Sequence, residues 1–397
     1  MKILFLNANL YGHINPTLGI VRKFSERGHS VSYFCAEPFA EYVKEAGAEW
    51  VGYGSRLDRF FREYRPTDRH PFFMLMEYML LYDEAALPDM MNIINEQDYD
   101  LIICDSYFGA ACFIKQMVNI PVVCSHSSFA MSRTPVPDRM LAEGFHPQLD
   151  NCYRVLRRIS GFWKVCEPTI SDVFISRGDL NIAYTTPRFN GDENIHEPDY
   201  LFAGAVQFTA QENKEILQRK AGKKLIYISL GSVNTDFVDF YKMCISAFRD
   251  TAYIVYMSIG RKNEVSELGE IPDNFVVDNF LPQRELLNYA DALITHAGFN
   301  SVNEAIYAGV PMLALPLVND QMMTAKRIAE LVLGLSEDMK TLTADKLIEK
   351  TELLLADDKF KDNCMALSAE IKDAAGLERA VSKIEEFVGE RKAERCH

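Results

Sequence analysis

The stretch Thr295-His296-Ala297-Gly298-Phe299-Asn300-Ser301-Val302-Asn303-Glu304-Ala305 decides the fold, and it continues through Gly309-Val310-Pro311 to Pro316-Leu317-Val318-Asn319-Asp320-Gln321. The apolar residues Ala292 to Thr295 predict a short strand, the small residues after them a turn, and the residues from about Asn300 a helix. Backbone N–H groups and the positive end of a helix converge at such a turn, which suits a diphosphate. The stretch therefore predicts a strand–turn–helix unit with an anion site at the carboxyl end of its strand.

Similar units extend outward from this stretch. The continuous apolar runs that predict buried parallel strands are, in the first half, Ile3 to Asn7, Val31 to Cys35, Leu101 to Cys104 and Pro121 to Cys124, and in the second half Leu225 to Leu230, Tyr253 to Met257, Phe275 to Val277 and Met312 to Leu315. Helical segments separate several of them, such as about Pro16 to Arg27 with Gly28 as its stop. The polar segment Gln207 to Lys224 predicts a linker between the halves. We therefore expect an α/β protein of two doubly wound, Rossmann-like domains whose strand ends face an interdomain cleft.

The composition agrees with two folded domains and narrows the choice of partners. Of 397 residues, 48% are apolar and 25% are charged, enough for two buried cores. A net charge of -14 argues against nucleic acid or an anionic membrane as a partner. The first apolar run, from Ile3, is too short for a signal peptide, and no later run approaches the roughly 20 apolar residues of a membrane span. The nine cysteines contain no CxxC pair, so we expect a soluble, cytoplasmic protein with reduced thiols.

A second site is predicted where the first strand ends, in Asn9-Leu10-Tyr11-Gly12-His13-Ile14-Asn15-Pro16. Asn15 is a candidate N-cap and Pro16 a candidate first residue of the following helix. His13 then lies at the carboxyl end of a strand. An imidazole, with a reference pKa of about 6.5, can take a proton from a hydroxyl near neutrality. The alternative is a histidine that only makes a hydrogen bond in a tight turn.

Asp105 is the candidate partner for that imidazole. It follows the strand Leu101 to Cys104, so we expect it at the same sheet edge as His13, where a carboxylate would fix the tautomer of the ring. The alternative is an N-cap for a helix starting near Tyr107, a role that Ser106 could also fill.

Together these motifs resemble the UDP-glycosyltransferase superfamily of GT-B glycosyltransferases, and within it the bacterial macrolide glycosyltransferase branch. The resemblance covers most of the chain and rests on the Gly-His-x-x-Pro pattern around His13, on Asn279 to Gln283 and on His296 to Gln321. One departure is His296-Ala297-Gly298, where the family usually has His-Gly-Gly. The resemblance implies an acceptor-binding domain at 1–206, a linker at 207–224, a nucleotide-sugar-binding domain at 225–375, and a last helix at 376–397 that packs back on the first domain.

The resemblance also implies a donor site in the second half. It assigns the phosphates to His296, Asn300 and Ser301, and the ribose to Glu304. The uracil would stack on Phe280. The complete donor set, in which Asp320 and Gln321 bind the sugar hydroxyls, is Gly231, Ser232, Phe280, Leu281, Gln283, His296, Gly298, Phe299, Asn300, Ser301, Glu304, Asp320 and Gln321.

Four of these donor motifs also have a simpler interpretation. Ser301 to Glu304 spells a capping box that needs no ligand, and Phe280 could be a core residue at a strand end. Asp320 could cap a helix over Met322 to Leu333, and Gly231-Ser232 could be an ordinary turn.

Residues Phe60 to Met91 are rich in aromatic and methionine side chains and correspond to the variable acceptor-facing region of the family. Such side chains suit a large apolar acceptor such as a macrolide, polyketide or flavonoid, in antibiotic biosynthesis or resistance. The candidates are Phe60, Phe61, Phe73, Met76, Tyr78 and Met79. The alternative is that these side chains line helix-packing faces.

These roles imply an inverting transfer, in which His13, oriented by Asp105, deprotonates an acceptor hydroxyl that displaces UDP, or TDP, from the anomeric carbon of a sugar. No metal and no other cofactor is expected, because Asp98-Tyr99-Asp100 matches the DxD motif of GT-A enzymes but precedes its strand, at the wrong sheet edge. The alternatives are a nucleotide-sugar epimerase on the same scaffold and a non-catalytic sugar-nucleotide-binding helper. GxGxxG is missing after the first strand, which argues against an NAD-dependent enzyme. The chain could be a monomer or a homodimer.

Overall fold

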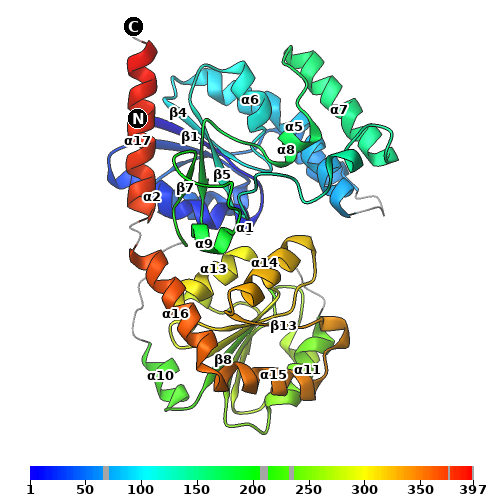
Figure 1. Ribbon diagram of the computed structural model, residues 1–397, viewed down its shortest axis with the longest axis vertical. Coiled ribbons are helices and arrows are strands. Elements are labelled where there is room, and N and C mark those ends of the chain that lie inside the picture. The colour runs from blue at the N-terminus through cyan, green and yellow to red at the C-terminus, as the bar shows by residue number, and fades with distance from the viewer. Residues whose placement is uncertain (66–70, 206–212, 232–236, 374–375, 396–397) are drawn as a thin grey trace. The chain divides into compact units, whose positions relative to one another are not determined.

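The computed structural model describes residues 1–65, 71–205, 213–231, 237–373 and 376–395. The chain forms two compact units, an N-terminal unit of residues 1–204 with 375–397 and a C-terminal unit of residues 205–374. Each unit contains one parallel sheet flanked by helices (Figure 1). The doubly wound, Rossmann-like pattern predicted for both halves is confirmed.

The sheet of the N-terminal unit has the order β3-β2-β1-β4-β5-β6-β7. Its strands are β1 (Lys2–Leu6), β2 (Ser30–Phe34), β3 (Glu49–Val51), β4 (Leu101–Asp105), β5 (Val122–His126), β6 (Leu180–Ala183) and β7 (Tyr200–Phe202). All neighbouring strands pair in parallel, with Leu6 opposite Cys104 and Cys104 opposite Cys124. The residues that follow β1, β4 and β5 therefore meet at one edge of the sheet.

Helices cover both faces of this sheet. They are α1 (Tyr11–Ile14), η1 (Asn15–Thr17), α2 (Leu18–Glu26), η2 (Glu37–Phe39), α3 (Ala40–Glu45), α4 (Ser55–Glu63), α5 (Pro71–Glu96), α6 (Ala111–Met117), η3 (Asp138–Met140), α7 (Pro147–Trp163), α8 (Ile170–Phe174), α9 (Pro187–Asn190) and α17 (Gly376–Arg395). Side chains alternate along each strand, so Leu4 and Leu6 pack against α5 to α8, while Ile3 and Phe5 pack against α2, α3 and α17. Both faces are buried, which explains why these strands are continuously apolar.

The sheet of the C-terminal unit has the order β10-β9-β8-β11-β12-β13. Its strands are β8 (Leu225–Ser229), β9 (Ile254–Ser258), β10 (Phe275–Asp278), β11 (Ala292–Thr295), β12 (Met312–Ala314) and β13 (Gly334–Ser336). Its helices are α10 (Lys214–Lys220), α11 (Val238–Phe248), η4 (Val265–Leu268), α12 (Gln283–Leu287), α13 (Phe299–Ala308), α14 (Asn319–Glu330), η5 (Met339–Thr341), α15 (Ala344–Ala356) and α16 (Asp358–Asp373). The segment expected as a linker thus contains helix α10, and its residues 207–212 lie outside the described part of the chain.

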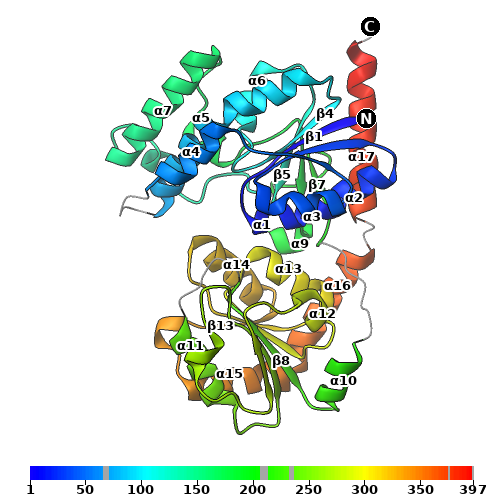
Figure 2. The same cartoon turned by 180° about the vertical axis from the view of Figure 1, so that it is seen from behind.

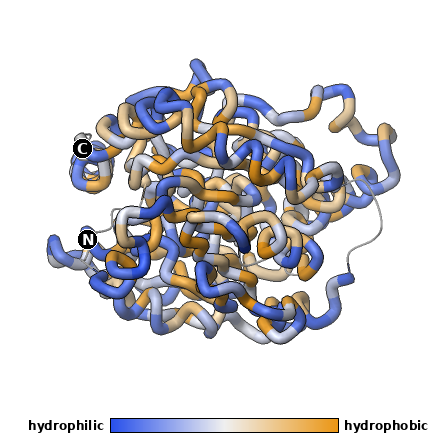
Figure 3. Tube along the Cα trace, turned by 90° about the horizontal axis from the view of Figure 1, so that it is seen from below, coloured by the Kyte–Doolittle hydropathy of each residue, from blue (hydrophilic) through white to orange (hydrophobic). Residues whose placement is uncertain are grey.

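Helix α17 belongs to the N-terminal unit, where it packs beside α2 (Figure 2). Val381 and Ile384 are buried against the sheet face that carries Ile3 and Phe5. The guanidinium of Arg27 bonds Glu378 and Glu385, each at 2.6 Å. The hydropathy-coloured trace in Figure 3 shows hydrophobic and hydrophilic residues alternating along the outer helices, as expected of helices with one buried face.

Some local predictions differ from the structure. The first helical turn begins at Tyr11 rather than near Pro16, and Asn15 has helical angles (φ -53°, ψ -41°), so the predicted N-cap at Asn15 is wrong. Gly28, with φ 78°, ends α2 as predicted. The strands β3, β6, β7 and β13 were not predicted. The residues after Thr343 form the helices α15, α16 and α17.

Candidate active site

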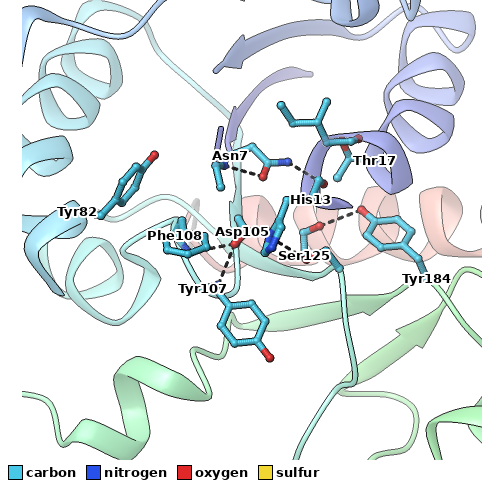
Figure 4. A network of polar contacts seen from close by, with 12 residues as sticks. Asn7, His13, Thr17, Tyr82, Asp105, Tyr107, Phe108, Ser125 and Tyr184 are labelled. Atoms are coloured by element: carbon cyan, nitrogen blue, oxygen red, sulfur yellow. Dashed lines mark hydrogen bonds and ion pairs between the residues drawn. The ribbon is translucent and has the colours of Figure 1, made fainter. Parts of the chain in front are cut away.

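The predicted pair of His13 and Asp105 is present at the carboxyl edge of the N-terminal sheet. Nδ1 of His13 lies 2.7 Å from Oδ2 of Asp105 (Figure 4). The Asp105 side chain is fully buried, whereas the His13 side chain is 17% exposed. Oγ of Ser127, after β5, lies 2.9 Å from the same Nδ1. Both groups engage Nδ1, which leaves Nε2 as the ring nitrogen that can take a proton from a bound molecule.

The second oxygen of Asp105 organises the loop after β4. Oδ1 accepts hydrogen bonds from the backbone N–H groups of Tyr107 and Phe108, each at 2.9 Å. Helix α6 begins only at Ala111, so Asp105 is not its N-cap. Oγ of Ser106 is buried and has no hydrogen-bond partner among the described residues, so Ser106 does not fill that role. The contact with His13 and the contacts with this loop are compatible because one carboxylate has two oxygens.

A buried polar network behind His13 holds the turn that carries it. Asn7, the residue after β1, donates from Nδ2 to the carbonyl oxygen of His13 at 3.2 Å and to the hydroxyl of Tyr33 at 2.6 Å. Thr17 also bonds the Tyr33 hydroxyl, at 2.6 Å. The sequence prediction missed this network and Ser127. The available signal was a polar residue directly after each of the buried strands β1 and β5.

In the C-terminal unit, the ring of His296 lies against two glycines. A Cβ atom on Gly231 would come within 2.6 Å of this ring, and one on Gly298 within 2.5 Å. Burial lowers the pKa of His296 to about 4, despite a hydrogen bond to the backbone of Ser229 that acts in the opposite direction. The ring is therefore neutral at pH 7. Its Nδ1 is buried and has no hydrogen-bond partner among the described residues, so it can serve a ligand.

The turn after His296 exposes the start of a helix. Ala297 has φ 62°, in the left-handed region that favours glycine, which explains why the family usually has glycine there. Helix α13 begins at Phe299, and Gly298, its N-cap, makes no side-chain capping bond. The positive end of its dipole therefore lies in the turn that follows His296. Phe299 is buried, whereas Asn300 and Ser301 are partly exposed.

Glu304 is held by two consecutive residues of α12. Gln283 donates from Nε2 to Oε2 of Glu304 at 2.7 Å and to Oγ of Ser301 at 3.2 Å, and Nε of Arg284 lies 2.8 Å from Oε1 of Glu304. Because α13 begins before Ser301 and Glu304 bonds α12, the capping-box interpretation of Ser301 to Glu304 is wrong. Arg284 was not predicted, although it directly follows Gln283 in the sequence.

The remaining donor candidates follow β8, β10 and β12 in the chain. Phe280 is 73% exposed, so the core interpretation of this ring is wrong, and Leu281 beside it is partly buried. Oε1 of Gln321 accepts from the backbone N–H groups of Leu317 and Val318. Helix α14 begins at Asn319, so the exposed Asp320 lies in its first turn and is not its N-cap. Ser232 lies outside the described residues.

The acceptor candidates divide into two groups. Phe60, Phe61 and Tyr78 are partly exposed and contact one another, with ring centroids of Phe60 and Tyr78 5.3 Å apart. Phe73, Met76 and Met79 are buried in the core beneath α5, as the helix-packing alternative requires. Only the first group has surface that a bound molecule could touch without repacking the helix.

The described residues contain no group of three or more His, Cys, Asp or Glu side chains placed to hold a metal ion. Asp100 of the DxD-like sequence lies at the amino end of β4, where it accepts from the backbone N–H of Lys2 and pairs with Lys392. This is the edge opposite His13, as predicted. No helix in the described ranges is long and apolar enough to cross a membrane.

Comparison with known proteins gives concordant matches. Residues 177–395 match the family model described as UDP-glucoronosyl and UDP-glucosyl transferase. The chain is 31% identical to the NDP-glycosyltransferase YjiC of Bacillus subtilis, over 97% of each protein. It is 28% identical to the oleandomycin glycosyltransferase of Streptomyces antibioticus, over 94% of this chain and 88% of that protein. The crystal structure of the glycotransferase of kitacinnamycin, 25% identical, superposes with a TM-score of 0.83 over 97% of this chain and 98% of that one.

Proposed function

We propose a reaction for this chain on the premise that it belongs to the UDP-glucoronosyl and UDP-glucosyl transferase family and is therefore a glycosyltransferase with the GT-B fold. The chain moves a sugar from a UDP-sugar, or alternatively a TDP-sugar, to a hydroxyl of a lipophilic small-molecule acceptor. The pairing of His13 with Asp105 carries this proposal. Asp105 holds Nδ1 of the imidazole, and Nε2 can then act as the general base.

The proposed chemical step is a single displacement. Nε2 of His13 takes the proton of the acceptor hydroxyl while the acceptor oxygen forms a bond to the anomeric carbon of the sugar. The bond from that carbon to the diphosphate oxygen breaks, and its electron pair leaves with the nucleoside diphosphate. Attack and departure occur on opposite sides of the carbon, so its configuration inverts. Asp105 stabilises the imidazolium that forms, through its contact with Nδ1.

The negative charge of the leaving diphosphate requires stabilisation. The start of α13 offers the positive end of the helix dipole. The neutral ring of His296 adds a hydrogen bond rather than a charge. We assign the ribose hydroxyls to Glu304 and the base to the exposed ring of Phe280. The base assignment does not choose between uracil and thymine, so both nucleotides belong in the experiment.

The proposal requires the two groups of residues to meet. His13 and Asp105 lie in the N-terminal unit and the donor candidates in the C-terminal unit. Transfer needs the acceptor oxygen to come within about 3 Å of Nε2 and to reach the anomeric carbon. An interdomain cleft that brings the two groups together is therefore part of the proposal.

The acceptor class is proposed from the surroundings of the base and from the relatives. Partly exposed aromatic rings on α4 and α5 favour a large apolar acceptor. One relative is named as an oleandomycin glycosyltransferase and one similar structure as the glycotransferase of kitacinnamycin. A natural product of comparable size is consistent with both observations.

Incubation of the purified protein with UDP-glucose or TDP-glucose and a panel of phenols and macrolides, read by mass spectrometry, tests the proposal. We expect a glycosylated product whose anomeric configuration is opposite to that of the donor. Turnover of the nucleotide sugar without an acceptor would instead indicate an epimerase. Nucleotide binding without transfer to any acceptor would indicate a non-catalytic helper.

A further inference from the structure

We propose that Tyr107 binds the acceptor and selects molecules whose reactive hydroxyl is attached to a flat aromatic ring. The inference rests on the proposed function and names the acceptor class that the N-terminal unit takes.

The catalytic carboxylate itself fixes two aromatic residues beside the base. Oδ1 of Asp105 accepts the backbone N–H groups of both Tyr107 and Phe108. The Tyr107 ring centroid lies 5.9 Å from that of His13, with an interplanar angle of 78°, and the Phe108 centroid lies at 5.5 Å with an angle of 60°. Any acceptor that presents a hydroxyl to His13 approaches a ring with aromatic neighbours.

Of these two neighbours, Tyr107 has the larger accessible surface. Phe108 is 5% exposed and packs against Tyr78 at 5.8 Å and Tyr82 at 5.3 Å, so it belongs to the core. Tyr107 is partly exposed, and its ring contacts Phe174 at 5.6 Å. In Figure 4 the Tyr107 side chain extends from the Asp105 loop on the side away from Asn7, with its hydroxyl directed away from the His13 ring.

The acceptor chemistry follows from this position. Because Nδ1 of His13 is engaged by Asp105 and Ser127, the hydroxyl must approach Nε2 while the rest of the acceptor lies beside the ring. The Tyr107 ring can make favourable stacking or edge contacts with a flat aromatic ring of the acceptor. A saturated ring does not make such contacts. A phenolic hydroxyl, with a pKa of about 10, also gives up its proton more readily than a saturated alcohol. Orientation and acidity therefore favour the same class, phenols.

The experiment compares two acceptors that share one carbon skeleton and differ in aromaticity, 2-naphthol and decahydro-2-naphthol. We expect the wild-type kcat/KM to be at least tenfold higher for 2-naphthol. Tyr107→Leu should raise KM for 2-naphthol about tenfold and change KM for decahydro-2-naphthol and for the nucleotide sugar less than twofold. Tyr107→Phe, which keeps the ring, should retain the wild-type preference.

Phe162→Leu is the matched control, because Phe162 is an aromatic residue that is 74% exposed on α7. This variant should leave both acceptor KM values unchanged. If Tyr107→Leu does not fold, as judged by thermal melting, Tyr107→Met replaces it with another flexible apolar side chain.

The outcomes separate the two proposals. Equal changes of KM for both acceptors in Tyr107→Leu, or a wild-type preference for the saturated alcohol, would overturn the assignment of Tyr107 while leaving the transferase function intact. Failure of the wild-type protein to glycosylate any acceptor of the full panel would remove the proposed function and this inference together.

Discussion

The two candidate histidines, one in each unit, follow comparable strands but have different partners. His13 lies in the short helix α1 after β1, and His296 lies in the turn after β11. Nδ1 of His13 contacts the carboxylate of Asp105, whereas Nδ1 of His296 is buried without a hydrogen-bond partner among the described residues and the pKa of that ring is lowered to about 4. An imidazole paired with a carboxylate can exchange a proton during a reaction, while one that stays neutral can offer only a hydrogen bond. The same residue type is therefore proposed as the base in one unit and as a neutral phosphate contact in the other.

The largest expected effect comes from removing the base. His13→Ala should lower kcat by about 10⁴-fold, because no other group takes the acceptor proton. UDP affinity, measured by calorimetry, should stay within twofold of wild type, because the donor candidates lie in the other unit. Transfer at the wild-type rate would show that His13 is not the base.

A subtler substitution tests the partner of the base. Asp105→Asn keeps an oxygen for the backbone N–H groups of Tyr107 and Phe108 but removes the charge beside Nδ1 of His13. We expect kcat to fall by about 10²- to 10⁴-fold, because the imidazolium is no longer stabilised and the required tautomer is disfavoured. The melting temperature should change little. A large loss of stability with retained kcat would mean that Asp105 only stabilises the loop after β4 and does not assist His13.

Two histidines with lowered pKa values, His126 and His296, make the free energy of unfolding depend on pH. His126 at the end of β5 resembles His296, since burial lowers the pKa of each to about 4. Unfolded histidine binds its proton near pH 6.5, so between pH 6.5 and 4 the unfolded state holds more protons than the folded state. The contribution of these two rings to the free energy of unfolding should therefore be fully present above pH 6.5. It should be lost as the pH drops towards 4, by about 3 kcal/mol for each ring.

Urea unfolding at pH 7, 5.5 and 4.5 measures this loss. His126→Asn should remove part of the pH dependence without changing the donor residues. If the free energy of unfolding changes with pH equally in this variant and in the wild type, His126 does not contribute to the pH dependence.

The smallest expected effect concerns the turn beside His296. Ala297 has φ 62°, which costs a residue with a Cβ atom about 1 kcal/mol relative to glycine. Ala297→Gly should therefore stabilise the protein by about 1 kcal/mol in urea unfolding. Gly28→Ala is the matched comparison, since Gly28 has φ 78° and open space around it, and should destabilise by a similar amount. A destabilised Ala297→Gly variant would show that the methyl group contributes packing that outweighs the strain.

The outcome for individual residues shows where sequence prediction succeeds. The strand at Leu101 to Cys104 and the apolar stretch at Ala292 to Thr295 were placed to within one residue, because local hydrophobicity specifies buried strands. The contact of His13 with Asp105 could be expected because adjacent parallel strands align their carboxyl ends. Ser127 directly follows a buried strand, but no local pattern indicates that its side chain reaches Nδ1 of His13 or that Arg284 reaches Glu304.

The sequence by itself determined two parallel α/β sheets and the loops at their carboxyl edges, because apolar runs, glycines and helix-stop residues act over a few neighbouring positions. Only the tertiary structure decided how Asp105 divides its oxygens between His13 and the backbone, and which of Tyr107 and Phe108 reaches the surface. It also decided that Glu304 bonds α12 instead of closing a capping box. These choices depend on distances between residues far apart in the chain, and hydrogen bonds and burial follow distance in space.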